Sequence, residues 1–159
     1  MQKTEWLALG SVLGILGVVS GYLILDARSQ LRDVIRIAHM RDVQMGLDLF
    51  YGEQGIYPEA SESLALGQAN SACLQEEGFS APCPSGSDPF MAFVPASPTQ
   101  GLSEEVSCSG VENAYCYVGN NSGYRITFVL ESAHTRLGLQ EGVNCLTDQG
   151  FFAGACPAL

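Results

Sequence analysis

The amino-acid sequence predicts an α+β fold. A long N-terminal helix, part transmembrane and part amphipathic, packs on a small antiparallel β-sheet with disulfide-stapled loops. Residues 6–25 contain no charged residue and no proline, and residues 26–51 continue without proline. Residues 115–131 have the alternation and the turn composition of a β-hairpin. All six cysteines lie in the later part of the chain, and 159 residues suit one domain with an appendage.

The uncharged stretch from Trp6 to Leu25 has the ~20 residues that a membrane-spanning helix needs. A cleaved signal peptide is the alternative, but its apolar core is usually about 7–15 residues long and ends at a small-residue cleavage site. Here the stretch continues directly into Asp26. We therefore expect a retained transmembrane anchor over residues 1–27 and a head, residues 28–159, outside the cytoplasm.

The charges that flank this stretch favour the opposite orientation. Lys3 precedes it and four arginines follow it, which the positive-inside rule would place in the cytoplasm. The cysteines instead favour an oxidising compartment for the same residues. We give the cysteines more weight, so the expected location is the cytoplasmic membrane, single-pass, or a cell-surface filament.

Residues 28–54 predict an amphipathic continuation of the helix, because apolar side chains recur every three or four positions in two stripes. One stripe, broken at Asp42, contains Leu31, Ile35, Ala38, Met45 and Leu49, and the other contains Val34, Ile37, Met40, Leu47 and Phe50. We expect a sheet to cover one stripe. Asp33 can pair with Arg36 within the helix at about 0.2–0.5 kcal/mol. The helix should end near Gly52–Gly55, because Pro58 cannot continue it.

The sheet is predicted within residues 113–159. Strands are expected at Tyr115–Val118 and Tyr124–Leu130, joined by the turn residues Gly119–Gly123. In the second strand, alternate residues from Tyr124 to Leu130 share one apolar face. Val143–Thr147 is a weaker strand candidate.

Residues 55–112 are rich in serine, glycine, proline and alanine, so they predict loops. Within them we expect one short helix near Ser61–Gln68. Phe90–Val94 is a further weak strand candidate.

The cysteines predict disulfides in preference to a zinc site, because the chain has no C-x-x-C motif and only two histidines, His39 and His134. We expect the three sequential pairs, since each closes a short loop and can stabilise the head by ~2–3 kcal/mol. The pairs are Cys73–Cys83, Cys108–Cys116 and Cys145–Cys156.

The net charge of −10 argues against nucleic-acid binding, since Arg125 and Arg136 are the only arginines or lysines after Glu53. No nucleophile-elbow, zinc-protease, phosphate-loop or dinucleotide motif is present, so we expect no enzyme and no cofactor. Calcium is the alternative to the absence of a cofactor. Its candidate oxygen donors are Glu141, Asn144 and Asp148, whose spacing matches no established calcium motif.

Three short motifs mark the N-terminal part of the chain. Glu5 precedes the apolar run, Gly14-Ile15-Leu16 follows nine residues further on, and Gly55-Ile56-Tyr57-Pro58 closes the expected helix. With these motifs the chain resembles type IV pilins and type II secretion pseudopilins, whose helix ends in a similar asparagine-glycine-x-tyrosine-proline segment. The resemblance covers residues 1–58 well and the remainder in outline. It implies that Glu5 pairs with the amine of Met1 of a neighbouring subunit and sets the stagger between helices.

The resemblance further implies a structural subunit of a pilus or secretion pseudopilus. Its partners would be other copies or related subunits, the membrane, and the assembly machinery. The sequence departs from the family at Gln2, Lys3 and Tyr22, and no leader ending in glycine precedes Met1. The alternative is therefore a membrane-anchored extracytoplasmic binding module that does not polymerise, with an anchored hydrolase as a third.

Overall fold

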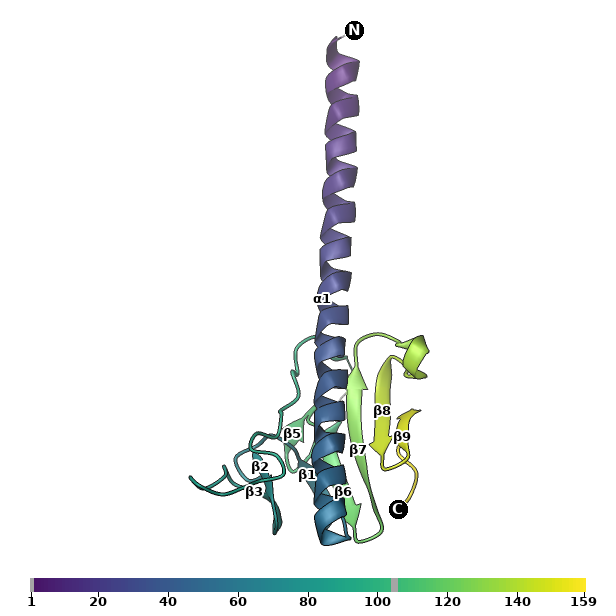
Figure 1. Ribbon diagram of the computed structural model, residues 1–159. Coiled ribbons are helices and arrows are strands. Elements are labelled where there is room, and N and C mark those ends of the chain that lie inside the picture. The colour runs from purple at the N-terminus through teal and green to yellow at the C-terminus, as the bar shows by residue number, and fades with distance from the viewer. Residues whose placement is uncertain (1, 104–105) are drawn as a thin grey trace.

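The computed structural model describes residues 2–103 and 106–159, without the side chains of residues 2–12, 15, 22 and 24–26. One helix, α1 (Gln2–Gln54), forms a straight rod whose second half lies on the head (Figure 1). The remaining elements are β1 (Ala60–Ala65), β2 (Cys73–Gln75), β3 (Gly78–Ser80), β4 (Ser107–Cys108), β5 (Val111–Glu112), β6 (Cys116–Asn120), β7 (Gly123–Leu130), the 3₁₀ turn η1 (Thr135–Leu137), β8 (Gly142–Thr147) and β9 (Gly150–Ala153).

Five strands form one antiparallel sheet in the order β1-β6-β7-β8-β9. The predicted hairpin is confirmed as β6 and β7, and the predicted strand at Val143–Thr147 is confirmed as β8. The hairpin turn is shorter than expected, because the strands already pair at Asn120 and Gly123. The side-chain oxygen Oδ1 of Asn120 accepts hydrogen bonds from the backbone amides of Ser122 and Gly123. Strands β2 and β3, and β4 and β5, form two small separate hairpins.

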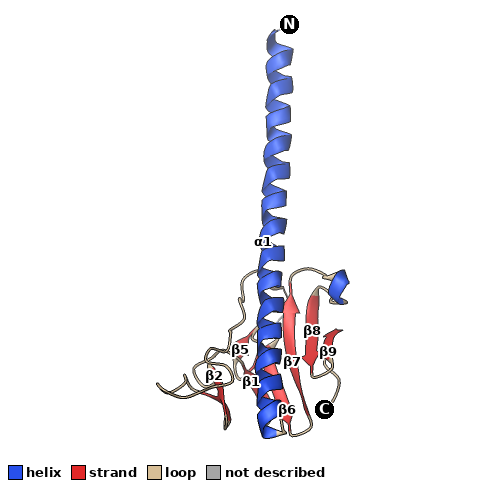
Figure 2. Cartoon of the chain, viewed as in Figure 1, coloured by secondary structure: helices blue, strands red, loops and turns tan. Residues whose placement is uncertain are grey.

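The C-terminal half of α1 crosses one face of the sheet, and the core lies between them (Figure 2). The sheet contributes the buried side chains of Tyr124, Ile126, Phe128 and Leu130, as their alternation predicted. The helix contributes Ile37, Met40, Val43, Leu47 and Phe50. Coverage of this stripe is thus confirmed, except that Val34 is 55% exposed.

The end of the helix follows the predicted signals. Gly55 adopts a left-handed conformation with φ of 71°, and its amide donates to the carbonyl of Tyr51 at 2.8 Å. Glycine takes this conformation without the steric cost that a Cβ brings. The chain can therefore turn back toward β1 directly after Gln54.

The transmembrane part of the predicted fold class is wrong. No helix in the described part of the chain is both long enough and apolar enough to cross a membrane. The predicted anchor over residues 1–27 and the single-pass membrane localisation are corrected accordingly. The fold is α+β with one helix, a five-stranded sheet and disulfides.

Two local predictions in the loop-rich region are also wrong. Ser61–Gln68 contains most of strand β1 instead of a short helix, because the segment pairs with β6 at the sheet edge. Phe90–Val94 forms no strand in the structure as described, since it meets β2 only through a bridge between Leu74 and Met91.

All three predicted disulfides are confirmed. Their Cα atoms are 5.4, 5.7 and 5.1 Å apart for the first, second and third pair along the chain. The first, Cys73–Cys83, closes the loop that carries β2 and β3, and the third, Cys145–Cys156, ties the C-terminal segment to β8. Such bridges are typical of proteins that fold in an oxidising compartment.

Candidate functional site

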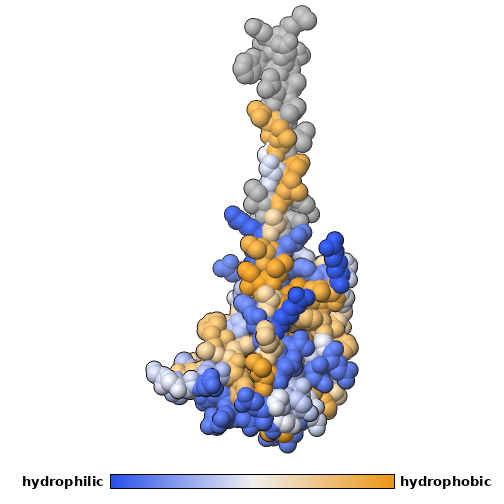
Figure 3. Space-filling model, in the orientation of Figure 1, coloured by the Kyte–Doolittle hydropathy of each residue, from blue (hydrophilic) through white to orange (hydrophobic). Residues whose placement is uncertain are grey.

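The protruding part of α1 presents large apolar side chains to solvent. Their exposed fractions range from 49% for Val19 to 75% for Val18. Leu13, Leu16 and Leu23 lie within this range. Figure 1 shows this part of the helix extending away from the head, and Figure 3 shows apolar side chains on the coloured portion of it.

These side chains lie around more than one side of the helix. At 3.6 residues per turn, Leu13 and Val18 point about 140° apart around the axis. A helix that is apolar on several sides is normally buried by neighbours on several sides. This part of α1 therefore exposes an apolar surface that none of the described head covers.

The half of α1 that lies on the head has one exposed apolar stripe. Its members are Leu31, Val34, Ile35, Met45 and Leu49, between 40% and 61% exposed. The stripe lies on the side of the helix away from the sheet, because the opposite side is buried in the core. Of the two predicted stripes, the sheet covers one and leaves the other open.

A buried ionic cluster fixes the helix to the head. Asp33 and Arg36 are both completely buried on α1, with Arg36 Nη1 donating to Asp33 Oδ1 at 2.7 Å. The amides of Glu131 and Ser132 donate to the two oxygens of Asp33 at 2.9 and 2.8 Å. We call Asp33, Arg36, Glu131 and Arg32 the clamp. It joins α1 to the chain directly after β7.

Arg36 also binds a loop from the middle of the chain. Its Nη2 donates to the carbonyl oxygens of Pro98, at 2.5 Å, and Gln100, at 2.8 Å. Gly101 follows with φ of 81°, and a Cβ there would lie 2.3 Å from Glu131 Oε2. Glycine is therefore required at this position both by the backbone and by the close approach of the clamp.

Glu131 bridges the two arginines of the clamp. Its carboxylate accepts from Arg36 Nη1 at 2.7 Å and from Arg32 Nε at 2.6 Å, and Arg32 Nη2 forms a second bond to it. Burial alone would raise the pKa of Glu131, but the hydrogen bonds from Arg32 and Arg36 outweigh it and lower this pKa below its usual value. The carboxylate is therefore held ionised.

Each of the two histidines lies close to one polar side chain. His134 Nε2 lies 3.5 Å from Asp33 Oδ2 at the border of the clamp. His39 Nδ1 lies 3.1 Å from the hydroxyl of Tyr115. Burial lowers the pKa of His39 and raises the pKa of Tyr115.

The assembly residues suggested by the sequence lie on the protruding helix, and the structure describes only some of them. Met1 and the side chains of Glu5 and Ile15 lie outside the described residues. Gly14 has open space where a Cβ would stand, and Leu16 is 56% exposed.

The calcium candidates are not brought together. The side-chain nitrogen Nδ2 of Asn144 donates to the backbone carbonyls of Gln140 and Gly142, at 2.7 and 2.9 Å. The side-chain oxygen Oδ1 of Asn144 accepts from the backbone amide of Gln140. Glu141 and Asp148 flank opposite ends of β8. Among the residues described, no group of three or more histidine, cysteine or acidic side chains could hold a metal.

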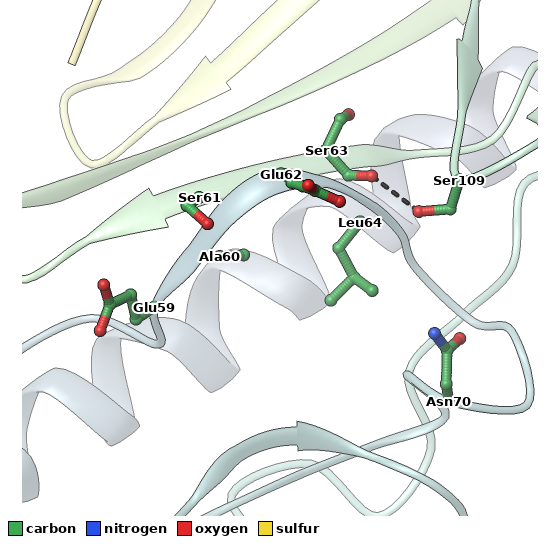
Figure 4. Close-up of a pocket in the computed structure, with 8 residues that line it drawn as sticks. All are labelled: Glu59, Ala60, Ser61, Glu62, Ser63, Leu64, Asn70 and Ser109. Atoms are coloured by element: carbon green, nitrogen blue, oxygen red, sulfur yellow. Dashed lines mark hydrogen bonds between the residues drawn. The ribbon is translucent and has the colours of Figure 1, made fainter.

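A surface hollow of about 590 Å³ lies along the edge strand β1 (Figure 4). Its lining consists of Glu59, Ala60, Ser61, Glu62, Ser63, Leu64, Asn70 and Ser109. Ser109 Oγ donates to the Ser63 carbonyl at 2.7 Å, and the pairing register with β6 shifts between Ala60 and Leu64. An interrupted, capped and acidic edge resists the addition of another strand. The register shift, the Ser109 hydrogen bond and the acidic side chains therefore disfavour strand addition at this edge of the sheet.

The comparisons with other proteins add no family to this picture. No protein-family model matches the chain, and no curated protein or solved structure shows significant similarity to it.

Sequence reasoning missed the clamp as a site, although a signal for half of it exists. Asp33 and Arg36 follow the same three- and four-residue steps as Met40, Val43 and Leu47, which places them on the buried face. The pair is thus not the weak surface interaction that the sequence suggested. Glu131 carries no local signal of its role.

Replacing Arg36 with methionine should destabilise the head by about 3–5 kcal/mol, because Asp33 and Glu131 would lose their shared buried cation. Urea unfolding monitored by circular dichroism measures this loss. Arg136→Met, at an exposed arginine, is the control and should change little. A cost below about 1 kcal/mol for Arg36→Met would contradict the role of the clamp.

The clamp should also make stability depend on pH in the acid range. Because the pKa of Glu131 is lowered in the folded state, its contribution is present above the usual carboxylate pKa and disappears as pH falls through the folded value. Glu131→Gln should lower stability at neutral pH by about 1–3 kcal/mol and flatten its decline below about pH 4.5. Parallel acid-unfolding curves for the variant and the parent would show that Glu131 is not the titrating group.

Proposed function

We propose that the chain is a non-enzymatic structural subunit that assembles with other copies, or related chains, through the protruding part of α1. The single observation that carries this proposal is the set of exposed apolar side chains from Leu13 to Leu23, on a helix that extends beyond its own head. The resemblance to type IV pilins and type II secretion pseudopilins supports a filament as the product of assembly.

The energetics favour association of this segment. Each valine or leucine that a neighbour buries contributes about 1.5–3 kcal/mol through removal of apolar surface from water. Several such side chains on one helix can offset the translational and rotational entropy lost on association. The helix is continuous from Gln2 into the clamped half, so force on the assembled segment passes directly to the head.

The head suits the outer surface of such an assembly. It carries most of the net charge of −10, which keeps a surface soluble and repels other acidic surfaces. Three disulfides stabilise the loops of the head, so these loops do not need a large hydrophobic core of their own. These features explain a durable exterior and require no catalytic chemistry.

A binding module that stays monomeric is the second candidate function. The polar residues Gln2 and Lys3, where the pilin family prefers apolar or small residues, favour it. The two functions differ in one measurable property, which is whether the purified full chain forms filaments.

Val18→Asp should abolish assembly, because a carboxylate would be buried in the contact between helices. Sedimentation velocity and negative-stain electron microscopy of the full chain measure this. Phe93→Asp is the matched control, since Phe93 is also 75% exposed but lies on the head. Equal assembly of the two variants would argue against the helix as the contact, and a monomeric parent chain would favour the binding module.

Glu5→Ala should weaken filament formation if Glu5 pairs with the amine of Met1 in a neighbouring copy, as the resemblance implies. Loss of a charge-assisted pair in an apolar surrounding should raise the concentration needed for assembly by about tenfold or more. Glu5→Gln separates the effect of charge from that of size. Assembly of both variants at the parental concentration would exclude the proposed pair.

A further inference from the structure

The exposed stripe on the clamped half of α1 is interrupted by the exposed Asp42 and is bordered by opposite charges on its two flanks. Arg41 lies on one flank and Glu53 on the other, about 120° apart around the helix axis and separated by ~18 Å along it. Both residues are exposed. None of the ion pairs found in the described part of the chain involves either of them.

Glu53 belongs to a groove between α1 and the disulfide loop that carries β2 and β3. The groove has a volume of about 270 Å³ and is lined by Leu49, Glu53, Glu76, Asp88, Pro89 and Phe90. Phe90 packs edge-on against the buried ring of Phe50 at 5.2 Å, which fixes this wall to the helix. The groove thus combines an apolar wall with three carboxylates at its rim.

This combination suits the side chain of an arginine. The aliphatic part of an arginine packs on apolar surface, and its planar guanidinium donates to carboxylates. Arg41 cannot reach the groove of its own chain, because ~18 Å of rigid helix separates it from Glu53. A second copy that lies parallel to the first and is displaced by ~18 Å toward the Gln54 end brings its Arg41 level with that groove.

We propose that the exposed stripe of α1 is a lateral docking face for a second copy of this chain, with Arg41 of one copy bound in the acidic groove of the next. The inference rests on the proposed function and names the contact that would set the stagger between heads. Leu49, which both ends the stripe and lines the groove, joins the apolar and the ionic parts of the interface.

The geometry favours a second copy over a different partner, because one chain carries both halves of the contact. Arg41 and the acidic groove lie on different flanks of the same face. The interface is therefore heterologous, because each copy contributes a different part of its surface to the contact. A heterologous contact that does not close into a ring continues as an open filament.

Charge reversal on the full chain tests the proposal. Arg41→Glu should raise the concentration needed for assembly by about tenfold or more, because a carboxylate would face the carboxylates of the groove. The double reversal Glu53→Arg with Glu76→Arg should have a similar effect. Combining Arg41→Glu with both groove reversals should restore assembly, which a merely misfolded head could not do. Arg136→Glu, at an exposed arginine on η1, is the matched control.

The outcomes separate a failure of the docking face from a failure of the proposed function. Assembly of Arg41→Glu at the parental concentration overturns the docking face and leaves the proposed function standing, provided that Val18→Asp still blocks assembly. Failure of the triple variant to recover, with a normally folded head, also overturns the pairing of Arg41 with the groove. A parent chain that never assembles overturns both.

Discussion

The carboxylate of Asp33 is the point on which the arrangement of helix and head depends. It is completely buried and accepts hydrogen bonds from Arg36 and from the amides of Glu131 and Ser132. Burying an ion is favourable only when such partners satisfy it, so the clamp exists in one geometry. Through the carbonyls of Pro98 and Gln100, Arg36 extends that geometry to a loop that would otherwise have few fixed contacts.

The clamp divides the helix into a half that is fixed to the head and a half that protrudes from it. On the clamped half, the face with Met40 and Leu47 is covered by the sheet, and the opposite face remains open. On the protruding half, described side chains such as Val18 are exposed without cover from the head. A rigid rod that is half fixed and half free can transmit the position of one head to its neighbours. The proposed subunit role and the proposed stagger both follow from that division.

Local patterns in the sequence predicted the parts of the fold that local chemistry decides. The disulfide pairs followed from short loops, the β6–β7 hairpin from alternation, and the helix end from Gly55. Partners distant in sequence were not predictable. Strand β1 forms because β6 lies beside it, and Glu131 enters the clamp from 95 residues beyond Arg36. The membrane assignment failed because an uncharged run of residues does not by itself identify its surroundings.

Amide hydrogen exchange at Glu131 and Ser132 tests the clamp most directly. These two amides donate to Asp33, in a segment that follows the last residue of β7. If the clamp holds the helix on the head, both amides exchange only through global unfolding, at the rate of the central strand β7. Exchange as fast as that of the exposed hairpin turn at Asn121 would mean that helix and head separate freely, and would contradict the account.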